Sequence, residues 1–244
     1  MNVFEYDGVV GFDDLAADGF QMVPATDVAA CFVTTKDERG TGGYATLLTE
    51  CVWVETRGVD TRLWSADQYM ATDVDVRGYT AFGNPDGVAI LPRRPFHKKV
   101  GNKPRADVML AVRTEPNADI ENKTRTDVLF VELPATAQSV KAGAGIVRDK
   151  ASTTFRLSGR GLTWETMDKF FSQSAGDSSD DVFMNVGFLT KAAKVMDVVY
   201  KVPRGNDVSA RIHTTGSLSP VHFERSEANV ATKRVRVLAM PCRG

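Results

Sequence analysis

The stretch ATKRVRVLAM, at positions 231–240, alternates apolar and polar side chains. In an extended chain Val235, Val237 and Ala239 fall on one face, while Arg234 and Arg236 fall on the other. A period of two predicts a β-strand with one buried and one polar face. The stretch TECVWVET, at 49–56, alternates in the same way.

Short runs of β-branched and apolar residues recur along the whole chain, bounded by turn residues. They predict strands at 28–35, 44–56, 73–82, 88–91, 107–114, 127–133, 153–158, 195–202, 208–214 and 230–240. The sequence GNPDGV at 83–88 predicts a hairpin or tight turn. Helices are expected at 162–173, where Thr163 can cap the first turn, and as short pieces at 65–70 and 14–20. The stretch 183–196 fits a helix and a strand equally well.

Many strands, few helices and no β-α-β alternation predict a mainly β protein. We expect an antiparallel β-sandwich or barrel, jelly-roll-like, with two or three short helices. The chain of 244 residues is interpreted as a single β-rich domain, 1–244, with a flexible loop at 172–181 (SQSAGDSSDD).

The composition is that of a folded, soluble protein, with 43% apolar and 25% charged residues. No apolar run is long enough to span a membrane, so no membrane partner is expected. The start of the chain does not read as a signal peptide, and Cys31, Cys51 and Cys242 do not form a disulfide framework. We therefore expect a cytoplasmic or virion location.

The most distinctive stretch is the basic segment 93–105, which we interpret as an extended loop because it contains two prolines and follows a third, Pro92. Together with the basic strand near the C-terminus it supplies the candidate residues for binding nucleic acid or another anion: Arg93, Arg94, Lys98, Lys99, Lys103, Arg105, Arg234 and Arg236. Phe96 is a candidate for stacking on a base. The segment equally fits an acidic surface on a neighbouring copy, or a solvated connection with no role.

No cofactor, metal site or catalytic residue is expected. The histidines, His97, His213 and His222, lack the spacing of a zinc motif, although His213 and His222 flank a turn and could meet across a hairpin. No nucleophile motif is present, and GTGGY at 40–44 lacks the lysine of a phosphate-binding loop.

An enzymatic alternative rests on two adjacent lysines, because each ammonium disfavours protonation of the other. The stretch HKKVGNK at 97–103 resembles the lysine-pair segment of the acetoacetate decarboxylases. That resemblance implies a Schiff base at Lys98 or Lys99. The sequence departs from the family at 92–94, where Pro-Arg-Arg stands in place of an expected glutamate.

The absence of a catalytic constellation, together with the segregated charge, favours a non-enzymatic, self-associating structural protein. We expect a viral or phage virion component whose basic loop contacts nucleic acid or an acidic neighbouring subunit. The expected partners are further copies of the chain and nucleic acid. The alternatives are a nucleic-acid-binding module that does not assemble, and a Schiff-base lysine enzyme.

Overall fold

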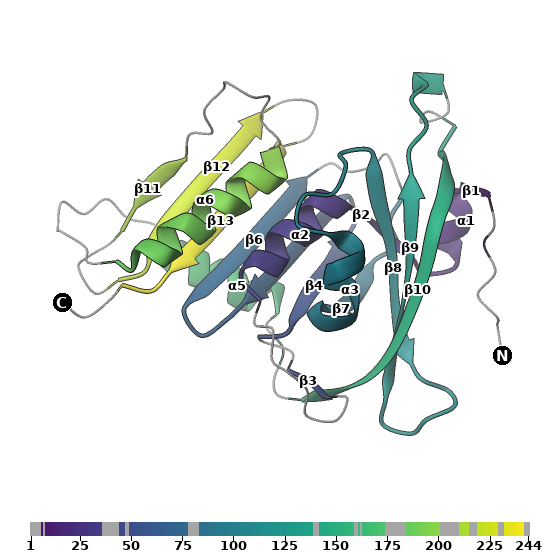
Figure 1. Cartoon of the computed structure of the whole chain (residues 1–244), viewed down its shortest axis with the longest axis horizontal. Helices are drawn as coiled ribbons and strands as arrows, with labels where there is room; N and C mark the ends of the chain where they lie inside the picture. Colours follow the sequence, from purple (N-terminus) through teal and green to yellow (C-terminus); the bar gives the residue numbers. More distant parts are fainter. Residues whose placement is uncertain are drawn as a thin grey trace.

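The computed structural model describes residues 6, 8–35, 44–46, 49–77, 83–138, 142–158, 161, 163–173, 184–200, 210–214, 219–228 and 232–241. Two β-sheets dominate this part of the chain (Figure 1). The mainly β, antiparallel fold class predicted from the sequence is confirmed. One pair of strands, β3 with β10, is parallel.

The six-stranded sheet has the order β1-β10-β9-β8-β2, with β3 added alongside β10. Its strands are β1 (Val9–Gly11), β2 (Gln21–Pro24), β3 (Tyr44–Thr46), β8 (Val108–Pro116), β9 (Thr124–Glu132) and β10 (Ala144–Ser158). The seven-stranded sheet has the order β11-β12-β13-β6-β5-β4-β7. Its strands are β4 (Cys51–Arg57), β5 (Asp60–Ala66), β6 (Met70–Arg77), β7 (Gly87–Pro92), β11 (Arg211–His213), β12 (Val221–Ala228) and β13 (Thr232–Ala239).

Strand β13 has the two faces that its alternation predicts. Val235, Val237 and Ala239 lie in the largest buried apolar cluster, which draws side chains from both sheets. Leu238, on the opposite face, packs in a separate cluster beneath a helix. Both faces of β13 are therefore covered, and the alternation reflects two different environments rather than core and solvent.

Five helices are described: α1 (Phe12–Ala17), α2 (Ala25–Val33), α3 (Arg93–Val100), α5 (Trp164–Gln173) and α6 (Val186–Tyr200). Helices α2, α3 and α6 lie together on one side of the sheets, and α5 lies behind the seven-stranded sheet (Figure 1). Helix α1 packs on the other face of the six-stranded sheet. None of these helices combines the length and apolar character needed to cross a bilayer.

Two segments predicted as strands are helical, which corrects the sequence interpretation. Of the predicted strand 28–35, residues 28–33 lie in α2. Of the predicted strand 195–202, residues 195–200 form the end of α6, and 201–202 lie outside the described residues. Helix α2 is buried nearly all round, from Ala25 to Phe32, so it has no polar face to mark a helical period. Continuous apolar runs of this length do not separate a buried helix from a buried strand.

The short-helix predictions had mixed outcomes. Helix α5 is confirmed, and the Oγ1 of Thr163 accepts a hydrogen bond from the backbone N–H of Thr166, as a capping residue does. The helix at 14–20 is confirmed as α1, which ends before Gly19. The helix at 65–70 is wrong, because Asp67 instead holds a turn between β5 and β6 by accepting from the N–H groups of Tyr69 and Met70. Of the loop predicted at 172–181, residues 172–173 end α5, and 174–181 lie outside the described residues.

Candidate nucleic-acid interface

The basic segment 93–105 starts as a helix rather than an extended loop, which corrects our prediction. Pro92 precedes α3 with an extended backbone (φ −63°, ψ 133°), and Pro95 falls in the first turn, where a missing N–H costs no helical hydrogen bond. The N–H of Arg93 donates to the carbonyl of Glu50 at 2.8 Å. The helix ends at Gly101, whose φ of 78° favours glycine.

Helix α3 divides its side chains between the core and the surface. Phe96 and Val100 are buried in the main apolar cluster, so the prediction that Phe96 stacks on a base is wrong. Arg94, Lys98 and Lys99 are exposed. His97, Lys98 and Lys99 occupy the last turn, where cations stabilise the negative end of the helix dipole. The buried side chains thus fix α3 against the core, and its basic side chains face the surface.

A first basic hollow, of about 190 Å³, lies where α3 meets α2 and α6. Arg93 and His97 line it from α3, and Lys191 and Lys194 line it from α6. Arg93 also donates to the carbonyl of Thr35 at 3.2 Å, which fixes its guanidinium. The two α6 lysines stand three residues apart and therefore share one helical face.

A second basic hollow, of about 260 Å³, lies on the other side of α3, beside β10. Its basic lining residues are Lys99, Lys103, Arg105 and Arg148. Three of them form exposed ion pairs: Lys99 with Asp149 at 3.2 Å, Lys103 with Asp197 at 2.7 Å, and Arg105 with both Asp107 and Glu132. Hydrogen bonds to Asp107 and Glu132 raise the pKa of Arg105. Exposed pairs of this kind are weak, so a phosphate can displace the carboxylate.

Arg234 and Arg236 lie apart from this surface, on the α5 face of the seven-stranded sheet. Arg236 is buried and donates to the Oδ2 of Asp73 from its Nε at 2.8 Å and from a terminal nitrogen at 2.5 Å. Arg234 pairs with Asp75 at 3.0 Å. We leave both arginines out of the candidate interface because internal carboxylates already occupy them.

The two adjacent lysines do not line a closed apolar cavity. Lys98 is exposed, and the exposed Lys99 donates to Asp149 and to the carbonyl of Lys150. A Schiff-base lysine needs a pocket that encloses its substrate, and these two exposed side chains do not lie in one. This geometry favours binding over covalent chemistry.

The sequence analysis missed three basic residues of this surface: Lys191, Lys194 and Arg148. The lysines lie in the stretch that fitted helix and strand equally well, and only the fold brings α6 beside α3. Arg148 interrupts the register between β9 and β10, where the pairing shifts between Val147 and Asp149. Nothing local in the sequence marks that irregularity.

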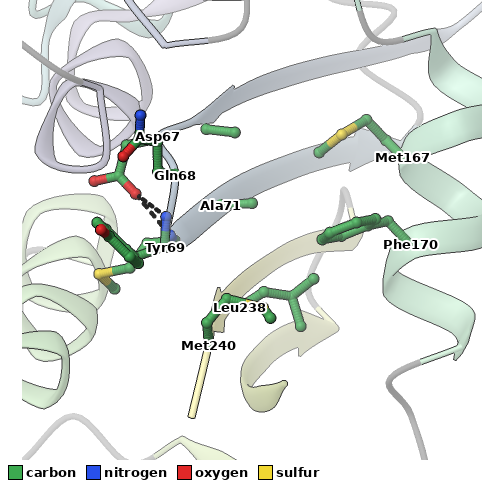
Figure 2. Close-up of a pocket in the computed structure, with 10 residues that line it drawn as sticks. Asp67, Gln68, Tyr69, Ala71, Met167, Phe170, Leu238 and Met240 are labelled. Carbon is green, nitrogen blue, oxygen red and sulfur yellow. Dashed lines mark hydrogen bonds between the residues drawn. The ribbon is translucent and has the colours of Figure 1, made fainter. Parts of the chain in front are cut away.

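A separate apolar pocket of about 260 Å³ lies between α5 and the β5–β6 turn (Figure 2). Met167 and Phe170 enter it from α5, Tyr69 from the β5–β6 turn, and Leu238 and Met240 from the end of β13. Tyr69, Phe170 and Met240 are 56%, 47% and 40% exposed, which is unusual for side chains so apolar. The sequence alone did not identify this pocket.

No family model matches the sequence, and no curated protein matches it. The fold does match solved structures. A protein from Eubacterium rectale assigned as a DNA polymerase III beta subunit aligns with a TM-score of 0.50 and 11% identity, covering 99% of this chain and 67% of that one. The beta subunit of DNA polymerase from Streptococcus pyogenes aligns at 0.48, with 11% identity, 100% of this chain and 67% of that one. The DNA polymerase sliding clamp from Pseudomonas aeruginosa aligns at 0.45, with 10% identity, 100% of this chain and 69% of that one.

These matches contradict our prediction of a viral or phage virion component. The solved structure that aligns at a TM-score of 0.50 is that of a protein assigned as a DNA polymerase III beta subunit, not of a virion component. At this level of identity the likeness establishes the fold and nothing further.

Proposed function

We propose that this chain is the subunit of a self-associating DNA clamp, which encloses duplex DNA and holds a DNA polymerase on it. The observation that carries the proposal is the gathering of basic side chains around α3. Arg94, Lys98 and Lys194 are exposed, and in the described part of the chain none of them forms an ion pair. The fold shared with a polymerase beta subunit supports DNA over other polyanions.

The chemistry of this surface suits backbone contacts without reading of sequence. Lysine and arginine side chains from α3 and α6 reach phosphates as point charges and planar forks. Among the described residues, no exposed aromatic ring lies between these basic side chains to stack on a base, since Phe96 is buried. A clamp must move along DNA of any sequence, and contacts limited to phosphates allow that.

Self-association is supported by the two ends of the molecule. Strand β11 is at the edge of the seven-stranded sheet and β1 is at the edge of the six-stranded sheet. They lie at opposite ends of the long axis (Figure 1). Each edge carries an exposed apolar residue, Ile212 at 60% and Val9 at 72%. Contacts between unlike ends generate closed rings when the rotation between copies closes, and open strand edges favour such pairing.

The apolar pocket beside α5 is the surface we assign to the polymerase. It is concave and apolar, and it lies between α5 and the β5–β6 turn (Figure 2). Apolar side chains of a partner segment would bury Phe170 and Met240 there. DNA and polymerase would then contact different lining residues of one subunit. Phe170→Glu is expected to block polymerase attachment while leaving DNA binding unchanged.

The first experiment is the mass of the purified, nuclease-treated protein by light scattering at low and physiological salt, followed by duplex DNA binding across a salt series. We expect a small closed oligomer whose binding weakens steeply with salt. The variant Arg94→Ala/Lys98→Ala/Lys194→Ala should lower the slope of log K against log salt by about 0.9 for each lost phosphate contact. Lys169→Ala, an exposed lysine on α5, is the matched control and should leave the slope unchanged.

Two results would contradict the proposal. A protein that stays monomeric at all concentrations would refute the proposal of a self-associating clamp. A salt slope equal in the triple variant and in Lys169→Ala would show that DNA does not contact the α3 surface.

A further inference from the structure

Two of the three histidines face each other across neighbouring strands at the edge of the seven-stranded sheet. His213 on β11 is the direct cross-strand partner of His222 on β12. The Nε2 of His213 lies 2.9 Å from the Nδ1 of His222. Glu224 stands two residues beyond His222 and therefore on the same face of the strand. The donor atoms of all three side chains lie within 4.8 Å of one another.

We propose that His213, His222 and Glu224 form a binding site for a zinc ion. Two imidazole nitrogens and one carboxylate oxygen are a ligand set that zinc accepts, with the fourth position open to water or to another group. The meeting of the two histidines across a hairpin was expected from the sequence, but zinc motifs read by spacing along one helix do not detect ligands on paired strands.

The distances fit a zinc ion after a small adjustment. Zn–N bonds of about 2.0–2.1 Å at a tetrahedral angle place two ligand nitrogens about 3.3 Å apart. The present separation of 2.9 Å is a hydrogen-bond distance, in which one ring donates to the other. Opening it by a few tenths of an ångström needs only a side-chain rotation of His213, which is half-buried on a strand of three residues.

The surroundings hold the ligands in place. His222 is 1% exposed and its ring stacks on Phe171 of α5 at 5.4 Å, so it cannot turn away. Its Nε2 is buried without a hydrogen-bond partner, so its Nδ1 is the atom that faces the proposed ion.

The neighbouring charges leave room for a cation. Arg236 is the cross-strand partner of Glu224 on β13, but its guanidinium is bound to the buried Asp73. Arg211 is opposite Glu224 on β11, and the structure shows no ion pair between them. Within the described residues the carboxylate of Glu224 therefore has no cationic partner. It lies next to two imidazoles that can bind the same metal ion.

A zinc ion at this site would tie the edge strand to the sheet. Strand β11 has three residues and pairs only with β12 among the described strands. Two ligands on β12 and one on β11 would cross-link the strands through the metal. The inference does not depend on DNA binding or on ring formation.

The test uses the whole chain after chelator treatment and dialysis. Titration with zinc chloride in a calorimeter should show one ion bound per chain, and Co²⁺ should give the visible absorption of a tetrahedral site. His213→Gln and Glu224→Gln should each weaken zinc binding by at least about tenfold. His97→Gln, which changes the histidine on α3, is the matched control and should bind zinc like the wild type.

Either of two outcomes overturns the site. The first is a wild-type chain that does not bind zinc saturably, which would leave the pair as a simple His–His hydrogen bond. The second is binding that survives in both His213→Gln and Glu224→Gln, which would place the zinc elsewhere. Because His213 and Glu224 are only half-buried, these two variants test the site without removing a core side chain.

Discussion

Removal of the Asp73 carboxylate is expected to be among the most damaging single changes in this protein. Asp73 on β6 is fully buried and accepts hydrogen bonds from two buried arginines. The Nε of Arg62 lies 2.5 Å from its Oδ1, and the Nε of Arg236 lies 2.8 Å from its Oδ2. The substitution Asp73→Ala would leave both guanidinium groups buried without their main counterion.

The size of the effect follows from burial. Removing one partner of a buried ion pair costs about 3–5 kcal/mol, because the other charge stays buried and uncompensated. Here two charges are stranded, so the upper end of that range is expected. Asp168 on α5 contacts the same arginines, Arg62 at 2.8 Å and Arg236 at 3.8 Å, but its side chain is 49% exposed. Asp168→Ala should therefore cost less than about 1 kcal/mol.

Urea unfolding of wild type, Asp73→Ala and Asp168→Ala measures the difference. A combined variant, Asp73→Leu/Arg62→Met/Arg236→Met, should recover much of the lost stability, since replacing a whole buried ionic cluster by apolar side chains is often neutral. If Asp73→Ala loses no more stability than Asp168→Ala, the reasoning from burial is refuted.

Three further predictions concern local features. Thr163→Ala removes the cap of α5 and should lower the unfolding free energy by about 1 kcal/mol in thermal melts. Gly145→Ala would place a Cβ 2.5 Å from the Cγ1 of Val131 and should cost about 1–3 kcal/mol by the same measurement. Burial and the nearby His213 lower the pKa of His222 from 6.5 to about 4. Between pH 6.5 and pH 4 this histidine is therefore protonated in the unfolded chain and neutral in the folded chain. In metal-free protein this should reduce stability on the order of 2 kcal/mol between pH 7.5 and pH 5, and His222→Gln should lack that part of the pH dependence.

The sequence predicted strands best where the two faces of a strand differ. Val235 and Val237 enter the main core while Arg236 reaches Asp73, so β13 alternates cleanly. Helix α2 gave no such signal because nearly all of its side chains are buried. Helix α3 was hidden by its prolines, which are compatible with a helix only because Pro92 precedes the first turn and Pro95 lies within it.

Long-range pairing could not be predicted from local patterns. The turn signal GNPDGV at 83–88 suggested a hairpin between the strands on either side of it. Strands β6 and β7 are instead separated in the sheet by β5 and β4. Asn84 in this segment bonds to both backbone groups of Met22, far away in the chain. The segment is therefore held by contacts with residues that are distant in sequence.

The same limit applied to the candidate interface. Its basic residues on α3 were predicted because they are close together in the sequence, whatever structure the segment adopts. The contribution of Lys191 and Lys194 was not found, because it depends on α6 packing across α2 to reach α3. Arg234 and Arg236 were also predicted from the sequence, and they pair with Asp75 and Asp73 away from α3. The sequence of a basic strand face is the same whether that face meets solvent or buried carboxylates.

The ion pairs on the α3 surface bear on the kind of DNA binding the proposed function requires. Lys99, Lys103 and Arg105 already hold carboxylates at the surface. When a phosphate approaches one of them it replaces an existing partner, so the net gain per contact is smaller than for an unpaired lysine. A clamp that encloses DNA is retained by its shape, and strong contacts would only slow its movement. Neutralising Asp149 and Asp197 should therefore tighten DNA binding and steepen its salt dependence. Binding that stays unchanged in Asp149→Asn/Asp197→Asn would show that these pairs do not face the DNA.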